Sequence, residues 1–163
     1  MVGDSTRPTY YATWMWERPQ PARYFHSASG YGTLGYALPA AIGAQVAQPD
    51  LPVVALIGDG GLMFTLGELA VAVETQVPVK IIIWNNSGYQ EIANSMAASG
   101  IDASSTQYHA PDFQQIASGF GAVVHTPADL DELARALGEP ATGPVVIVMD
   151  ENKFVHQPSG AWY

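Results

Sequence analysis

Hydrophobic residues along the chain fall into short, uninterrupted runs separated by stretches of mixed polarity. Four of these runs predict β-strands: VVALI (53–57), VKIIIW (79–84), AVVH (122–125) and VVIVM (145–149). Residues 1–3 are interpreted as the end of another strand that began before this chain starts. Runs that are apolar at every position, rather than at alternate positions, are typical of parallel strands whose two faces are both covered.

The segments between the strands carry helix and loop signals. Helices are predicted over residues 37–48, 65–74, 87–97, 112–118 and 129–137. The other segments are expected to be irregular, namely the proline-rich residues up to 29, the glycine-rich residues 30–35 and the polar residues 98–111. Strands that alternate with helices imply an α/β fold, here a three-layer domain with a mainly parallel sheet flanked by helices.

Two of the predicted helices have capping signals at their N-termini. Asp112 is expected to cap one of them, because an Asp side chain accepts hydrogen bonds from free N–H groups of the first turn. Thr65 and Glu68 form a capping-box pattern at the start of another helix, with Thr65 as the cap and Glu68 reaching back. The inner face of that helix is predicted to consist of Leu66, Leu69, Ala70 and Val73.

Length and composition fit one well-buried globular domain covering residues 1–163. The chain is 48% hydrophobic and 13% charged, which is enough apolar material for a sizeable core. The sequence shows neither an 18-residue apolar run nor the basic and then apolar start of a signal peptide, so a cytoplasmic location is expected. The cysteine count of 0 excludes disulfides and zinc–cysteine sites.

The charge distribution argues against nucleic-acid binding. The net charge is −9, and the six Lys and Arg residues do not cluster. Anionic ligands other than nucleic acids would also find few cationic side chains. If the protein binds a phosphate group, backbone N–H groups and a metal ion must supply most of the attraction.

Polar residues directly follow two of the predicted strands. Asp59 comes after the strand 53–57, and Asn85 and Asn86 come at the end of the strand 79–84. Ligands of open parallel sheets bind beyond the carboxyl ends of the strands, so Asp59 and Asn86 converge if the two strands are neighbours. Carboxylate and amide oxygens suit Mg²⁺, which takes few protein ligands and completes its octahedron with phosphate oxygens and water.

Two glycine-rich stretches bear on the choice of ligand. Gly60 and Gly61 lack side chains, so their N–H groups can approach a phosphate closely, and the helix that follows adds its positive end. The stretch GYGTLG (30–35) formally matches a dinucleotide fingerprint, which leaves a nicotinamide-binding domain as an alternative. That alternative needs an apolar strand before the glycines, and ARYFHSAS (22–29) is a poor candidate for one.

The combination of Gly-Asp-Gly, a spacer of this length and Asn-Asn resembles the signature of thiamine-diphosphate-dependent enzymes. The resemblance is closest to the C-terminal cofactor domain of the acetolactate synthase and 2-oxo acid decarboxylase family, and it covers nearly the whole chain. In that family the Asp, the second Asn and a backbone carbonyl two residues later hold Mg²⁺ on the diphosphate. Those roles fall on Asp59, Asn86 and Gly88.

The resemblance extends to the segments before this signature. GYGTLGYALPAAIGA (30–44) is similar to the segment that grips the aminopyrimidine ring, which implies that the Gly32 carbonyl accepts from the 4′-amino group and that Leu34 bends the cofactor. Asp-Ser-Thr (4–6) matches a loop that contacts the diphosphate in relatives such as benzoylformate decarboxylase. The resemblance implies that the cofactor is bound by Ser5, Thr6, Gly32, Thr33, Leu34, Gly58, Asp59, Gly60, Gly61, Asn86, Gly88 and Tyr89.

Within the family, the sequence is most similar to 5-guanidino-2-oxopentanoate decarboxylases. The stretches that carry this likeness are DST, GYGTLGY, IGDGG and WNNSGYQEI. The large subunit of acetolactate synthase and a split subunit of the sulfopyruvate decarboxylase type remain as alternatives. Pyruvate decarboxylases have a catalytic Glu six residues after the second Asn, where this chain has Ile92, with Glu91 one place earlier.

The resemblance also implies that the site needs a second domain. In this family the Glu that activates the cofactor lies on a separate pyrimidine-binding domain, and nothing in residues 1–163 corresponds to it. No catalytic residue is therefore assigned to this chain, which is predicted to be inactive alone. Its expected partners are a pyrimidine-binding domain of the same enzyme or of a partner subunit in a homo- or hetero-oligomer, and a small 2-oxo acid.

A non-enzymatic alternative is a degenerate domain that keeps the fold as an interaction module. The presence of Asp59, Asn86 and Gly32 argues against it, because an interaction module has no need for a pair of metal ligands.

Overall fold

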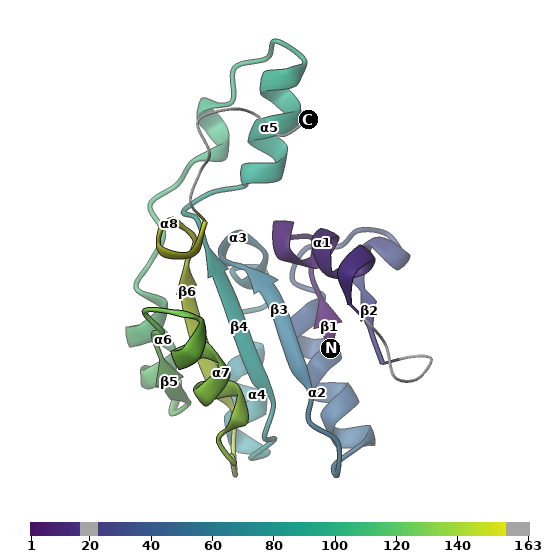
Figure 1. Ribbon diagram of the computed structural model, residues 1–163, viewed down its shortest axis with the longest axis vertical. Helices are drawn as coiled ribbons and strands as arrows, with labels where there is room; N and C mark the ends of the chain where they lie inside the picture. The colour runs from purple at the N-terminus through teal and green to yellow at the C-terminus, as the bar shows by residue number, and fades with distance from the viewer. Residues whose placement is uncertain (17–22, 156–163) are drawn as a thin grey trace.

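The computed structural model describes residues 1–16 and 23–155, and its centre is a single six-stranded sheet (Figure 1). All neighbouring strands are parallel, in the order β2-β1-β3-β4-β6-β5. The strands are β1 (Val2–Gly3), β2 (Phe25–His26), β3 (Val54–Gly58), β4 (Lys80–Asn85), β5 (Val123–His125) and β6 (Val145–Asp150). The parallel α/β class predicted from the sequence is confirmed.

Helices cover both faces of this sheet. They are α1 (Arg7–Met15), α2 (Ala37–Ala47), α3 (Asp59–Leu62), α4 (Glu68–Glu74), α5 (Gln90–Ala98), α6 (Phe113–Phe120), α7 (Leu130–Gly138) and α8 (Glu151–Phe154). In Figure 1, α7 lies in front of the sheet, α2 and α4 lie behind it, and α5 rises beyond the carboxyl ends of the strands. None of the helices in the described part of the chain combines the length and apolar character needed to cross a membrane.

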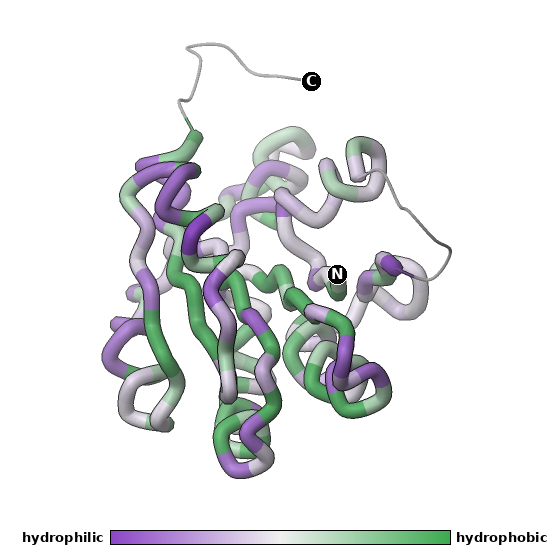
Figure 2. Tube along the Cα trace, turned by 60° about the horizontal axis from the view of Figure 1, so that its bottom comes forward, coloured by the Kyte–Doolittle hydropathy of each residue, from purple (hydrophilic) through white to green (hydrophobic). Residues whose placement is uncertain are grey.

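The central strand β4 shows why its run from Ile81 to Trp84 is apolar at consecutive positions. Ile81 and Ile83 belong to the main core, together with Leu38 of α2. Ile82, which points to the other face, packs in a second cluster with Leu133 of α7. Because both faces are covered, both sets of alternating side chains must be apolar, and Figure 2 shows long hydrophobic stretches running through the middle of the molecule.

Most of the predicted helices are present, with small shifts at their ends. Asp112 accepts a hydrogen bond from a backbone N–H in the first turn of α6, so that predicted cap is confirmed. Helix α5 begins at Gln90, three residues later than predicted. Ser87 has a left-handed backbone (φ 59°) and Gly88 pairs with Gln107 in an isolated antiparallel bridge, so the chain cannot yet be helical there.

The predicted capping box at Thr65 is wrong. The Thr65 hydroxyl donates instead to the carbonyl of Gly35, at 2.9 Å, and α4 begins only at Glu68 without a side-chain cap. The predicted inner face of α4 also needs one correction, because Ala70 is exposed while Ala72 is fully buried. The Thr65 side chain thus ties the start of α4 to the glycine-rich loop rather than to the helix itself.

The expectation that residues up to 29 are irregular is also wrong. Helix α1 occupies part of this segment, with Pro8 in its first turn, where the missing N–H of a proline costs nothing. The poor strand candidate before the glycines does form the short edge strand β2, which pairs with β1. A short 3₁₀ turn at Ser27–Ser29 follows it rather than an α-helix. Residues 17–22 of this segment lie outside the described residues.

Candidate functional site

The ends of β3 and β4 bring Asp59 and the Asn86 loop together. The two strands are direct neighbours, and Gly58 at the end of β3 pairs with Trp84 of β4. Asp59 is the first residue of α3 and only 2% exposed. Backbone N–H groups of Asn86 and Gly88 approach its carboxylate and favour its charged form. The predicted convergence of the two strand ends is therefore what the structure shows.

A cavity of about 400 Å³ opens beside these residues, at the carboxyl end of the sheet. Of the residues singled out in the sequence, those that line it are Ser5, Thr6, Gly32, Leu34, Gly58, Asp59, Gly60, Gly61, Asn86, Gly88 and Tyr89. Thr33 is exposed and does not line the cavity, so the structure separates it from the others. The sequence did not indicate the contributions of Arg7, Tyr10, Ala28 and Gln90.

Burial dominates the electrostatics of Asp59. Loss of solvent raises the pKa of its carboxyl, while hydrogen bonds from Tyr108 and from backbone N–H groups partly oppose that rise. The Tyr108 hydroxyl donates to Asp59 Oδ2 at 2.8 Å. Burial and this hydrogen bond raise the pKa of Tyr108 as well. Tyr108 comes from the polar segment 98–111, in which no sequence pattern indicated a contact with the site.

Asn86 has two chemically different ends, and the structure uses them differently. Its amide nitrogen Nδ2 donates to Oε2 of Glu151 at 3.0 Å. Its amide oxygen Oδ1 is buried and has no hydrogen-bond partner among the described residues. A buried acceptor left without a partner costs about 1–3 kcal/mol, so this oxygen marks a place prepared for another group.

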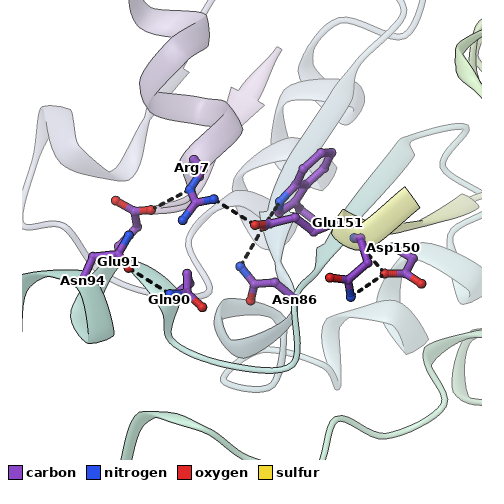
Figure 3. Close-up of polar contacts among 9 residues, drawn as sticks. Arg7, Asn86, Gln90, Glu91, Asn94, Asp150 and Glu151 are labelled. Atoms are coloured by element: carbon purple, nitrogen blue, oxygen red, sulfur yellow. Dashed lines mark hydrogen bonds and ion pairs between the residues drawn. The ribbon is translucent and has the colours of Figure 1, made fainter. Parts of the chain in front are cut away.

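Charged side chains meet on the wall of the cavity beside Asn86 (Figure 3). Arg7 donates from Nε to Glu91 at 3.1 Å and from Nη1 to Glu151 at 2.9 Å. Glu91 and Ile92, at the start of α5, also line the cavity. Arg7 and Glu151 are far apart in sequence, and local patterns carry no information about such a pair.

The glycines of the site serve close packing. A Cβ on Gly60 would lie 2.6 Å from Cε1 of Tyr89, so the Tyr89 ring needs a glycine beneath it. A Cβ on Gly61 would lie 3.2 Å from Oδ1 of Asp4. The sequence suggested that these two glycines allow a phosphate to approach. The structure adds a second reason for them, which is close packing against Tyr89 and Asp4.

Asp4 anchors the floor of this region. Its carboxylate is 1% exposed and accepts backbone hydrogen bonds from Ser5 and Ala37, at 2.8 and 3.0 Å. Burial raises the pKa of Asp4 despite these bonds. Because Ala37 begins α2, the carboxylate joins the loop after β1 to the positive end of that helix.

Comparison with known proteins identifies the family. The model of the thiamine pyrophosphate enzyme, C-terminal TPP binding domain, matches residues 4–149. The chain belongs to this family. Its cofactor is thiamine diphosphate, and Mg²⁺ is the usual partner metal in this family. The family assignment also confirms the resemblance drawn from the Gly-Asp-Gly and Asn-Asn segments, and it removes the support for a nicotinamide-binding domain.

The chain is similar to several enzymes of this thiamine diphosphate family. It is 38% identical over 135 residues to the probable 2-ketoarginine decarboxylase AruI of Pseudomonas aeruginosa, covering 82% of this chain and 24% of that protein. It is 36% identical over 148 residues to the acetolactate synthase of Bacillus subtilis, covering 84% and 25%. The thiamine diphosphate-dependent 4-hydroxybenzoylformate decarboxylase of Rhodococcus jostii RHA1 superimposes with a TM-score of 0.70 at 33% identity, covering 77% and 24%.

The chain matches only part of the length of these relatives. It spans 24% and 25% of the length of the two curated relatives. Thiamine diphosphate enzymes of this kind are multidomain proteins in which this domain pairs with a pyrimidine-binding domain.

The described residues fit the metal that accompanies thiamine diphosphate. They contain no group of three His, Cys, Asp or Glu side chains that could hold a metal ion. A metal here would therefore depend on amide and backbone oxygens in addition to Asp59. The buried, unpartnered oxygen of Asn86 is such a ligand, and the cavity leaves room for phosphate oxygens and water on an octahedral Mg²⁺.

Proposed function

We propose that this chain binds Mg²⁺–thiamine diphosphate as the diphosphate-binding part of a 2-oxo acid decarboxylase. The metal ligands would be the carboxylate of Asp59, the side-chain oxygen of Asn86 and the backbone carbonyl of Gly88. The observation that carries this assignment is the buried Oδ1 of Asn86, which has no partner among the described residues and belongs to the loop that contacts Asp59. Three hard oxygen donors at one strand edge suit a metal that also binds phosphate.

The rest of the cavity would hold the two ends of the cofactor. Ser5 and Thr6, just before α1, would contact the phosphate groups through their hydroxyl and backbone groups, together with the backbone of Gly60 and Gly61. A single Arg among the cavity-lining residues, already paired with two glutamates, supports a site that relies on the metal for charge compensation.

The aminopyrimidine end would lie against the glycine-rich loop. Gly32 adopts a left-handed backbone (φ 68°) and its carbonyl is 3.5 Å from the Ser5 hydroxyl. Leu34 lines the same cavity and would press on the cofactor between its two rings. Thr33 is exposed and stays outside the proposed contact set.

When bound, thiamine diphosphate supplies a thiazolium ring that accepts the electron pair released as CO₂ leaves a 2-oxo acid. The residues of this chain would bind and orient that cofactor. The proton transfer that activates it is assigned to the pyrimidine-binding domain, so no residue of this chain is given that role.

The proposed substrate is 5-guanidino-2-oxopentanoate, the 2-oxo acid also called 2-ketoarginine. The 38% identity to the Pseudomonas aeruginosa protein supports this choice. An acetolactate synthase activity is the second candidate, supported by the 36% identity to the Bacillus subtilis enzyme. The two are distinguished by assembling the chain with its pyrimidine-binding domain and comparing CO₂ release from the guanidino acid with acetolactate formation from pyruvate.

The first test is a calorimetric titration of thiamine diphosphate into the chain, with Mg²⁺ and then with EDTA. We expect binding with Mg²⁺ and none with EDTA. Asp59→Ala should abolish the metal-dependent binding while leaving the circular dichroism spectrum unchanged, because Asp59 is the first residue of the short helix α3 and contributes no apolar packing. Asp50→Ala, at an exposed carboxylate away from the cavity, is the matched control.

Two results would contradict the proposal. Normal binding by Asp59→Ala in Mg²⁺ would show that the ligand assignment is wrong. If the wild-type chain fails to bind the cofactor both alone and with the pyrimidine-binding domain present, the chain is the degenerate interaction module instead.

A further inference from the structure

Glu151 lies beside Asn86 because of the register between β4 and β6. Asn85 at the end of β4 pairs with Asp150 at the end of β6, so the next residue of each strand comes close to the other. Asp150 then caps the short helix α8 by accepting from the backbone N–H of Asn152, at 3.0 Å. Glu151 is therefore held at a fixed point in the fold, with only 7% of its surface exposed.

Three donors, one from α1 and two from the end of β4, converge on the Glu151 carboxylate. Arg7 of α1 donates to Oε1 at 2.9 Å. The indole Nε1 of Trp84 and the amide Nδ2 of Asn86 both donate to Oε2, at 2.5 and 3.0 Å. A carboxylate held on both oxygens cannot rotate away without breaking charged hydrogen bonds.

This arrangement decides which way the Asn86 amide faces. An ionised carboxylate only accepts hydrogen bonds, so the end of the amide that meets Glu151 must be the NH₂ group. The oxygen is then forced to the opposite side, where it is buried with no partner among the described residues. Without Glu151, either end of the amide could face the cavity.

We propose that Glu151 is a positioning residue that presents the amide oxygen of Asn86 as a metal ligand. This inference rests on the proposed function, because Asn86 must be a ligand for its orientation to matter. Arg7 and Trp84 act one step further out by fixing Glu151. Groups that orient a ligand in this way commonly contribute 10–100-fold to metal affinity.

Two substitutions at Glu151 separate orientation from packing. Glu151→Leu removes every acceptor, so the Asn86 amide loses its orientation, and we expect the Kd for Mg²⁺, measured with thiamine diphosphate present, to rise ~10-fold or more. Glu151→Gln keeps one oxygen, which can still accept from both Asn86 and Trp84, but its NH₂ group cannot accept from Arg7, so only the Arg7 contact is lost. This isosteric variant should retain most of the metal affinity. Glu139→Gln, at a side chain that is 61% exposed and outside the cavity, is the matched control and should bind as the wild type does.

A double-mutant cycle shows whether Glu151 acts through Asn86. If it does, Glu151→Leu weakens Mg²⁺ binding in the wild-type background and adds no further loss in an Asn86→Ala background. An equal loss in both backgrounds would mean that Glu151 supports the site only as a structural residue, and the positioning role would be overturned. Equal Kd values for the wild type and Glu151→Leu would overturn it as well.

A measurement without cofactor or metal tests the orientation directly. In ¹⁵N spectra of the chain, the side-chain NH₂ resonances of Asn86 should be shifted and slow to exchange in the wild type and in Glu151→Gln. In Glu151→Leu they should move to the values of a free amide. An ordered amide in a wild-type chain that binds no Mg²⁺–cofactor would contradict the proposed function, whereas an amide that is indifferent to Glu151→Leu would contradict the inference drawn here.

Discussion

Asp59 illustrates how a single residue can be set up for binding at a cost to the fold. Its carboxylate is nearly fully buried, and that burial outweighs the hydrogen bonds that favour the charged form, so the pKa is raised. The folded chain then holds the Asp59 proton more tightly than the unfolded chain does. A metal cation bound to the carboxylate would offset this penalty, because an opposite charge favours the ionised form.

The raised pKa of Asp59 predicts a specific pH dependence of stability in EDTA. A raised carboxyl pKa stabilises the fold fully below the unfolded value, and that contribution is lost as pH rises through the folded pKa. Asp59→Asn should therefore be more stable than the wild type at neutral pH, and the difference should shrink as pH falls toward about 4, near the ordinary Asp pKa. The Tyr108 hydroxyl, which donates to Asp59, can accept from the new amide instead.

Urea unfolding at a series of pH values measures this difference, with the exposed Asp50→Asn as the control. A wild type as stable as Asp59→Asn at neutral pH would show that the hydrogen bonds fully compensate for burial.

Single residues also show where sequence reasoning reached its limit. Asp59 and Asn86 were identified because they directly follow two strands, a position that has meaning in any parallel sheet. Thr33, which the family resemblance also placed at the cofactor, is exposed and does not line the cavity, so its predicted contact stays a prediction. Tyr108 and Arg7 were missed, since each reaches the site from a segment with no local signal of its own.

At the scale of secondary-structure elements, substitutions at two glycines should change the free energy of unfolding in opposite directions. Gly35 has a left-handed backbone (φ 82°), and a Cβ there would lie 2.9 Å from Thr65 Cγ2 and 3.1 Å from the Gly61 carbonyl. Gly43 lies inside α2 with nothing near its missing side chain. We expect Gly35→Ala to lower the free energy of unfolding by about 1–3 kcal/mol, and Gly43→Ala to raise it by roughly 0.5–1 kcal/mol.

Urea titrations of both variants beside the wild type test this pair. If Gly35→Ala leaves the free energy of unfolding unchanged, the loop between β2 and α2 can relax around a methyl group. Gly35 lies in the glycine-rich loop, which contacts Thr65 and lines the cavity. Gly35→Ala should therefore also lower the cofactor affinity more than Gly43→Ala does.

The elements that the sequence predicted are those with a strong local signal. Four strands were found from their apolar runs, and α6 was found from its Asp112 cap. Helix α8 was not predicted, because a segment of 4 residues is too short to show a helical period. Helix α1 was not predicted either, although Pro8 lies in its first turn. Its sequence has many aromatic residues but buries only Thr9, so it lacks the apolar face that identifies a helix.

At the scale of the whole molecule, the prediction concerns activity. We expect the isolated chain to show no decarboxylation of 5-guanidino-2-oxopentanoate in Mg²⁺ and thiamine diphosphate. The reason is that the Glu that activates the cofactor is expected on the pyrimidine-binding domain, and no carboxyl group of this chain is given that role. Addition of the pyrimidine-binding domain should restore CO₂ release, and Asp59→Ala should prevent that restoration.

Measured CO₂ release by the isolated chain that depends on both Mg²⁺ and cofactor would overturn this expectation. The Asp59→Ala variant serves as its control, because turnover that survives this substitution would come from a contaminating enzyme rather than from the chain.

The sequence by itself determined the class of fold, the edge of the sheet where the site lies and the residue types that suit a metal–diphosphate ligand. These depend on local periodicity and on which residues follow each strand, and both are written in consecutive positions. Only the tertiary structure decided the strand order β2-β1-β3-β4-β6-β5, and with it the neighbours of each site residue. Glu151 meets Asn86 because β6 lies beside β4 in one register, a long-range outcome of packing that no local pattern specifies.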